Sequence, residues 1–259
     1  MDNGEMRMEE TQQEKFSTLH SQLSIRENAI FVADAHYPHH GDEFLRLLTA
    51  LEEGRIETPQ LFLMGDIFDL LFGCGTYVQN FSSEAVAKLQ RLSGKMEIHY
   101  LEGNHDFCLK SIFPRINVYS RREQPVRMKM GGKSVALAHG DLYDTGWGYG
   151  LYSFLLRQCG FLCLFKRWDR SLSEPHLKRL RGKKICRDFA DFEAKAERIA
   201  AHYPAEAELI IEGHFHQGRK IGRYLSLPSL ACQKELGIVR NGEIEFVALD
   251  AVLEEKLKK

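Results

Sequence analysis

Three features are scarce or absent in this sequence, and each absence narrows the class of protein. The N-terminal stretch MDNGEMRMEETQQEK is too polar to hold the apolar core of a signal peptide, so we expect a cytoplasmic protein. The six cysteines form no CxxC pair, which argues against a structural zinc site or a disulfide framework and predicts free, mostly buried thiols. The formal net charge is only -1, so no overall basic character favours nucleic-acid binding.

Long hydrophobic runs are also missing. The most apolar stretch, Gly150 to Trp168, is interrupted by Arg157 and Gln158 and is too short to span a bilayer. With 259 residues, 44% hydrophobic and 27% charged, the chain fits one large α/β domain that carries an inserted lobe. Residues 1–27 are predicted to form a polar tail, and residues 28–259 to form the domain.

The remaining chain alternates short apolar runs with amphipathic ones. Residues 29–33, 60–64 and 97–101 predict buried strands, and the helical spacing of apolar side chains after Asp42 and after Ser83 predicts a helix in each gap. Two successive βαβ units indicate a parallel sheet, whose ligand site should lie beyond the carboxyl ends of the strands. Residues 125–130 and 133–138, joined by Gly131-Gly132, predict a β-hairpin.

Five short motifs rich in metal-binding side chains follow apolar runs. In chain order they are DAH at 34–36, GDIFD at 65–69, GNHD at 103–106, AHGD at 138–141 and GHFH at 213–216. Carboxylate, amide and imidazole donors without a thiolate suit manganese, iron or zinc better than calcium. The donors are too numerous for one ion, so we predict two divalent ions with Asp66 as their shared ligand.

The remaining predicted ligands divide into two sets. One ion is assigned Asp34, His36 and His216, and the other Asn104, His139 and His214. His105 follows a ligand directly and can face the substrate, where it would donate to a phosphoryl oxygen or to the leaving group. Asp69 is predicted to hold the His105 ring and fix its protonation. The other histidines are expected to be ordinary surface or core residues: His20, His39, His40, His99, His176 and His202.

A segment at about 145–205 separates the fourth motif from the fifth and is predicted to form a helical cap over the site. It joins an apolar, aromatic stretch to a basic one between Lys166 and Arg187. This pairing suits acyl chains with anionic head groups, or an anionic membrane surface, although a packed helical hairpin with a solvated basic face would have the same composition. The candidate substrate-binding residues are Arg157, Arg179, Lys183 and Arg187.

The five motifs, which span Asp34 to His216, closely resemble those of the calcineurin-like metallophosphoesterase superfamily. This resemblance implies an α/β fold, a four-layered αββα metallophosphoesterase sandwich with a dinuclear site. The segments ADAH, GDIFDLLFG, GNHDF and HGD, with a cap before GHFH, are similar to those of the UDP-2,3-diacylglucosamine pyrophosphatases of bacterial lipid A synthesis. Those are cytosolic, membrane-surface enzymes that usually use manganese. Many of them have arginine where this chain has His105.

The resemblance implies one reaction and leaves two alternatives. The implied reaction converts UDP-2,3-diacylglucosamine to UMP and 2,3-diacylglucosamine 1-phosphate by attack of a metal-bridging hydroxide, at the inner face of the cytoplasmic membrane. No nucleic acid and no obligate protein partner are expected. One alternative is a phosphodiesterase or phosphatase for soluble nucleotides or other phosphoesters. The other is a non-catalytic metal-binding scaffold, which is disfavoured because every ligand position holds a competent donor.

Overall fold

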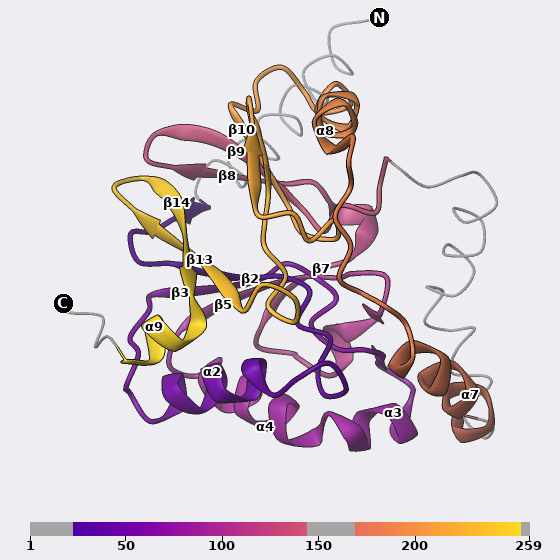
Figure 1. Cartoon of the computed structure of the whole chain (residues 1–259). Coiled ribbons are helices and arrows are strands. Elements are labelled where there is room, and N and C mark those ends of the chain that lie inside the picture. The colour runs from indigo at the N-terminus through magenta and orange to yellow at the C-terminus, as the bar shows by residue number, and fades with distance from the viewer. Residues whose placement is uncertain (1–22, 144–168, 255–259) are drawn as a thin grey trace, which may run out of the picture.

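Two six-stranded β-sheets form the centre of the computed structural model, which describes residues 23–143 and 169–254 (Figure 1). The first sheet has the order β14-β13-β2-β3-β5-β7, and the second has the order β1-β8-β9-β10-β12-β11. The strands of the first sheet are β2 (Ile30–Val32), β3 (Gln60–Leu63), β5 (Glu97–Leu101), β7 (Asn117–Tyr119), β13 (Glu235–Arg240) and β14 (Glu243–Ala248). Those of the second are β1 (Ser24–Ile25), β8 (Val126–Met130), β9 (Lys133–Ala138), β10 (Leu209–Glu212), β11 (Arg219–Ile221) and β12 (Tyr224–Ser226).

The predicted βαβ units are present in the first sheet. Strands β2, β3, β5 and β7 are parallel, and the connections between the first three carry α2 (Glu43–Glu52), α3 (Thr76–Phe81) and α4 (Ser83–Leu92). In α2 the apolar positions Phe44, Leu47, Leu48 and Leu51 are buried, as the helical spacing predicted. The predicted hairpin is the antiparallel pair β8 and β9. Short elements complete the described chain: β4 (Leu71–Phe72), β6 (Asp106–Phe107), and the 3-10 helices η1 (Leu109–Ser111) and η2 (Arg121–Glu123).

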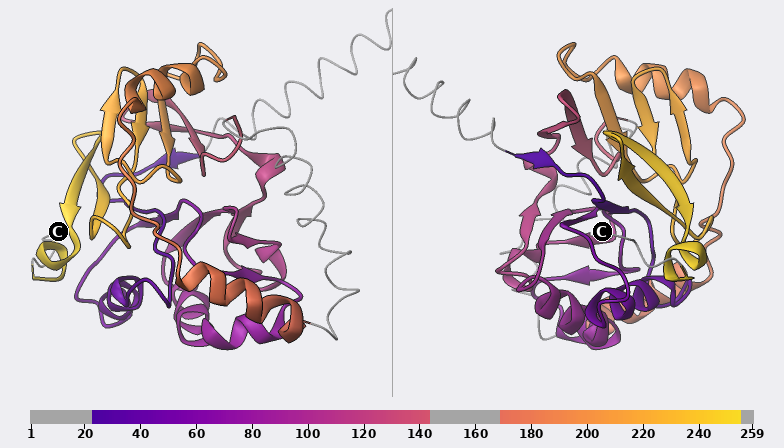
Figure 2. Two further views of the ribbon diagram at one scale, coloured as in Figure 1. Left: turned by 45° about the vertical axis from the view of Figure 1, so that its right-hand side comes forward. Right: turned by 90° about the vertical axis from the view of Figure 1, so that its left-hand side faces the viewer.

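Side chains of alternate strand residues build three apolar layers. Ile30 and Val32 on β2 face α2, α4 and α9 (Leu249–Glu254), whereas Phe31 points to the second sheet, where its ring stacks on Phe62. The outer face of the second sheet, including Ile210, packs against α8 (Phe192–Ala200). The order helix, sheet, sheet, helix confirms the predicted four-layered αββα sandwich (Figure 2).

The two helices described within the predicted cap segment lie in different places. Helix α8 forms the fourth layer of the sandwich, because Phe192, Ala196 and Ile199 bury its apolar face on the second sheet. The prediction that it belongs to a lid is therefore wrong. Helix α7 (Asp169–Arg181) packs beside α3 instead (Figures 1 and 2). Arg157 and the apolar part of the segment lie outside the described residues. None of the helices described is long and apolar enough to cross a bilayer.

Two further expectations need correction. The predicted tail ends before residue 27, because Ser24 and Ile25 form β1 beside β8, where Ile25 is buried. The prediction of free thiols is wrong for the described cysteines. Cys186, between α7 and α8, forms a disulfide with Cys232, in the loop after β12, and Cys74 and Cys108 are also disulfide-bonded. The Cys186–Cys232 partners are 46 residues apart, so only the fold brings them together.

Candidate dinuclear metal site

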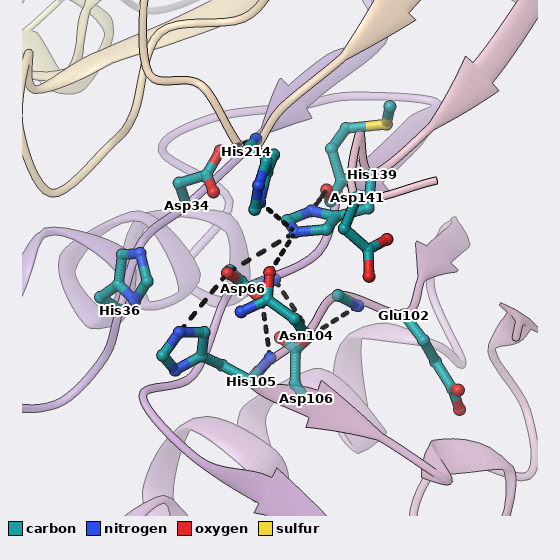
Figure 3. Close-up of polar contacts among 12 residues, drawn as sticks. Asp34, His36, Asp66, Glu102, Asn104, His105, Asp106, His139, Asp141 and His214 are labelled. Carbon is teal, nitrogen blue, oxygen red and sulfur yellow. Dashed lines mark hydrogen bonds and ion pairs between the residues drawn. The ribbon is translucent and has the colours of Figure 1, made fainter. Parts of the chain in front are cut away.

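The seven predicted metal ligands come together where the two sheets meet. Asp34, Asp66 and Asn104 follow the parallel strands β2, β3 and β5, so the first sheet delivers them at a single edge. His139 and His214 follow β9 and β10, which are parallel to each other in the second sheet. His36 and His216 lie two residues beyond Asp34 and His214. Figure 3 shows six of these side chains converging from the two sheets.

The first ligand set contains buried donor atoms without hydrogen-bond partners. One donor atom each from Asp34, His36 and His216 lie within 4.8 Å of one another. His216 Nε2 is 3.1 Å from Asp34 Oδ1, and the backbone N–H of His214 donates to Asp34 Oδ2 over 2.8 Å. Within the described chain, Asp34 Oδ1 and His36 Nδ1 are buried and make no hydrogen bond, and the contact of Asp34 Oδ1 with His216 is an ion pair. A buried polar atom without a hydrogen bond costs about 1–3 kcal/mol, so these atoms fit a role as ligands of a cation.

The second set is centred on His139 Nε2. This atom lies 3.3 Å from Asn104 Oδ1, 3.3 Å from His214 Nδ1 and 3.5 Å from Asp66 Oδ2 (Figure 3). The other ring nitrogen, Nδ1, is 2.9 Å from the carbonyl oxygen of Met64 and donates to it. In the neutral ring that bond leaves the Nε2 lone pair available, which is the arrangement of a metal-binding histidine. Both donor sets therefore fit divalent ions, although the shared role of Asp66 stays a prediction.

The predicted ligands also have unusual backbone conformations. Five of them have positive φ angles: Asp34 (50°), His36 (46°), Asp66 (51°), His214 (58°) and His216 (57°). Positive φ is uncommon for residues other than glycine, and each such residue costs of the order of 1–3 kcal/mol. Strain of this kind concentrates at functional sites. The strain therefore supports the assignment of these residues to a functional site, independently of the sequence motifs.

Burial and charge set the protonation of the metal-free site. Burial lowers the pKa of His36 and His214 to about 4, so both rings are neutral and ready to bind an ion. Burial also opposes protonation of His139, but the Asp66 and Asp34 carboxylates outweigh it and raise the pKa of His139 to about 10. Burial opposes ionisation of Asp66, yet His105 and His139 hold the pKa of Asp66 well below its usual value. Protonated His139 therefore contributes to balancing the charge of the Asp66 carboxylate.

Asp106 fixes the loops that carry two of the ligands, a role that the sequence analysis did not assign. Its buried carboxylate accepts hydrogen bonds from the backbone N–H groups of Asp66, Ile67, Phe68 and Gly103 and from the Tyr100 hydroxyl, over 2.6–3.3 Å. Two loops 40 residues apart are thereby held together. Gly103 is required at this junction, since a Cβ there would lie 2.3 Å from Asp66 Oδ1.

His105 lies beside Asp66, with its Nε2 3.9 Å from Asp66 Oδ2. Asp69 does hold the His105 ring, but through its main chain, because His105 Nδ1 donates to the Asp69 carbonyl oxygen over 2.8 Å. The Asp69 carboxylate binds other groups. Its Oδ2 accepts from the backbone N–H and Nδ1 of His39, and its Oδ1 accepts from Nδ1 of His40. His39 and His40, expected to be ordinary residues, therefore belong to the surroundings of the site.

The described cap residues include a helix that packs beside the loops carrying Asp69 and His105. Leu177 and Leu180 of α7 pack with Leu70 and Phe107, which directly follow Asp69 and Asp106. On the same helix, burial and the positive charges of His105, Arg179 and Lys183 lower the pKa of His176. The main chain of Arg187 lies near His216, because Nε2 of the next residue, Gln217, donates to the Arg187 carbonyl oxygen.

A strained, buried set of carboxylate, amide and imidazole donors at the ends of strands in an αββα sandwich defines a metallophosphoesterase site. Residues 28–218 match the family model for calcineurin-like phosphoesterase, and the chain belongs to that family. The protein is a metal-dependent phosphoester hydrolase, and its family implies a dinuclear divalent metal site.

Among characterised relatives, the chain is similar to the UDP-2,3-diacylglucosamine hydrolase of Porphyromonas gingivalis, with 32% identity over 223 residues, 74% of this chain and 84% of the relative. It is 27% identical over 172 residues to the UDP-2,3-diacylglucosamine hydrolase of Chromohalobacter salexigens, which covers 64% of this chain and 67% of that protein. A solved dimetal phosphatase from Danio rerio aligns with 86% of this chain and 99% of its own, at 11% identity. The TM-score of this alignment is 0.40.

Proposed function

We propose that this protein hydrolyses the diphosphate of UDP-2,3-diacylglucosamine and releases UMP and 2,3-diacylglucosamine 1-phosphate. The observation that carries the proposal is the 32% identity to the Porphyromonas gingivalis hydrolase across 84% of that enzyme. The complete donor set for two ions supports a catalyst rather than a scaffold.

The metal ligands are proposed as the two predicted sets. Asp34, His36 and His216 would hold one ion, and Asn104, His139 and His214 the other, with Asp66 shared. When bound, the ions supply an activated water and neutralise charge on the phosphoryl oxygens. The donor set suits manganese, with iron or zinc as the other candidates.

His105 is proposed to act on the substrate rather than to bind an ion. Its Nδ1 proton is committed to the Asp69 carbonyl oxygen, so Nε2 carries a proton only when the ring is charged. That charged ring, beside the Asp66 carboxylate, would donate its Nε2 proton to the oxygen of the departing phosphate. Asp69 is the positioning residue for this step.

Basic residues on and just after α7 support binding of an anionic substrate near His105. Arg179 and Lys183 act electrostatically on His176, and so does His105. Arg179, Lys183 and Arg187, together with Arg157 outside the described residues, are proposed to bind the anionic groups of the substrate. We place the reaction at the inner face of the cytoplasmic membrane, where a lipid-linked substrate would reside.

Turnover of UDP-2,3-diacylglucosamine with added manganese, compared with that of bis(p-nitrophenyl) phosphate, tests the reaction. UMP release that EDTA abolishes is the expected result. Activity on the aryl ester alone would favour the soluble-phosphoester alternative, and activity on neither would favour a scaffold.

A pair of double variants tests the substrate. The change Arg179→Ala with Lys183→Ala should raise KM for the lipid diphosphate far more than KM for the aryl ester. The matched control replaces Lys133 and Arg240, which lie at the strand ends opposite the site, and should change neither KM. Equal effects of the Arg179 and Lys183 changes on both substrates would refute the lipid assignment.

A further inference from the structure

His39 and His40 form a histidine pair that the metal site does not account for. Both Nδ1 atoms lie 2.8 Å from Asp69 carboxylate oxygens, so each ring donates there and directs its Nε2 away from Asp69. The side chains of His39 and His40 are 15% and 14% exposed. Within the described part of the chain, His40 Nε2 is a buried atom with no hydrogen-bond partner.

The His40 ring lies next to the first ligand set. Its centroid is 5.7 Å from that of His36, and the His105 centroid is 5.2 Å from that of His36. His36 is thus flanked by two rings that are both held by Asp69, one through the carboxylate and one through the carbonyl oxygen. Asp69 Oδ1, which binds His40, is itself 3.9 Å from His36 Nδ1.

We propose that His40 is a further substrate-contacting residue, whose Nε2 binds an oxygen of the phosphate that departs when the diphosphate is cleaved. Asp69 is then the positioning residue for His40 as well as for His105. This inference rests on the proposed function, because only a diphosphate substrate supplies a second phosphate beside the one held by the metal ligands.

The chemistry of the departing group fits an imidazole held in this way. A phosphate monoester has a pKa near 6 and therefore carries either a hydroxyl donor or an additional anionic oxygen near neutral pH. His40 Nε2 can accept from the first form as a neutral ring and donate to the second as a charged ring. The contact is thus available in either protonation state, and an unpaired buried Nε2 gains its missing partner.

A third metal ion is a poorer occupant. Among the described residues, the histidine, cysteine and carboxylate donor atoms converge in two groups of three, and neither includes His39 or His40. Asp69 offers no additional ligand atom to such an ion, since both of its carboxylate oxygens accept from these histidines.

Two substitutions of His40 distinguish direct contact with the substrate from a purely structural role. His40→Asn keeps a side-chain N–H near the Nδ1 position but removes Nε2, whereas His40→Gln places an amide nitrogen near Nε2. His202→Asn is the matched control, because exposed His202 also donates from Nδ1, to the Arg198 carbonyl oxygen. Each variant is assayed with UDP-2,3-diacylglucosamine and with bis(p-nitrophenyl) phosphate, which has no second phosphate, and its bound manganese is measured.

With the lipid diphosphate, His40→Asn should lower kcat/KM about tenfold to a hundredfold, the effect of one hydrogen bond to a charged group. Turnover of the aryl ester and manganese content should match the control, and His40→Gln should recover part of the loss. Equal losses on both substrates, lost manganese, or no loss on either would overturn the proposal.

Two further measurements keep the test decisive. If the wild-type protein cleaves only the aryl ester, the proposed function fails, and His40 is tested by inhibition of that reaction with glucosamine 1-phosphate. His40→Asn should weaken the inhibition, and unchanged or absent inhibition would overturn the proposal.

If His40→Asn unfolds more readily than the control, the wild type is treated with diethyl pyrocarbonate instead. Glucosamine 1-phosphate should protect His40, as read by mass spectrometry, and no protection would overturn the proposal.

Discussion

Asp106→Asn is expected to lower the free energy of unfolding by about 1–6 kcal/mol, because the change removes one acceptor oxygen from a carboxylate that accepts several hydrogen bonds from buried donors. If the new amide nitrogen replaces Oδ1, the backbone N–H of Asp66 loses its acceptor and faces another donor, whereas that of Gly103 keeps the Asp106 carbonyl oxygen at 3.1 Å. If it replaces Oδ2, the N–H groups of Ile67 and Phe68 are affected instead. One buried N–H group is unpaired in the first orientation and two in the second, at about 1–3 kcal/mol each.

The loss is large beside the total stability of a domain, which is about 5–15 kcal/mol. Urea unfolding followed by circular dichroism, in EDTA so that metal binding does not contribute, measures it directly. Asp250→Asn is the control, because this exposed carboxylate pairs with Arg46 at the surface and should contribute about 1 kcal/mol or less. A loss for Asp106→Asn no larger than that of the control would refute the assignment of Asp106 as the link between the two ligand loops. Manganese affinity should fall as well, since the link positions Asp66 and Asn104.

Three more predictions concern the ligands and their neighbour. His105→Ala should retain manganese and lose about a hundredfold to ten-thousandfold in kcat, whereas loss of the metal would make His105 a ligand. Protonated His139 must lose its proton to bind an ion, and its pKa is about 10, so manganese affinity should increase with pH up to about 10. Calorimetry near pH 7 in two buffers should then show net proton release on binding, and none would contradict the charged His139. In the metal-free protein, His36→Gly should be more stable than His36→Ala by about 1 kcal/mol, because glycine relieves the positive φ of 46°. The reverse order in denaturant unfolding would show that little strain is present there.

The sequence predicted which side chains lie together at the candidate site, because a few local rules determine where they lie. Apolar runs with intervening amphipathic helices imply parallel strands, and parallel strands place Asp34, Asp66 and Asn104 at one edge. The spacing of the apolar side chains in α2 likewise predicted its buried face. In both cases, residues close in the chain contain the whole signal.

Interactions between distant loops were not predictable in the same way. The Asp69 carboxylate accepts hydrogen bonds from His40 and His39, which lie 29 and 30 positions earlier in the chain. The spacing of the residues gives no reason to expect these histidines, rather than His105, as partners of that carboxylate. The amphipathic pattern of α8 correctly indicated a helix but did not say which apolar surface would cover it. The Cys186–Cys232 pairing depends on the path of the chain after α7, which no local pattern reveals.

Loops that follow strands of both β-sheets contribute predicted ligands, so the site connects the two sheets. Asp34 and Asp66 follow strands of the first sheet, whereas His139 and His214 follow strands of the second, so the predicted ligands are correctly placed only when the two sheets are correctly spaced. The spacing is set by the inter-sheet core that contains Phe31 and Phe62. Trimming such a core side chain would change the span between the ligands without altering any of them. The rate of turnover would therefore depend on how closely the two sheets are packed.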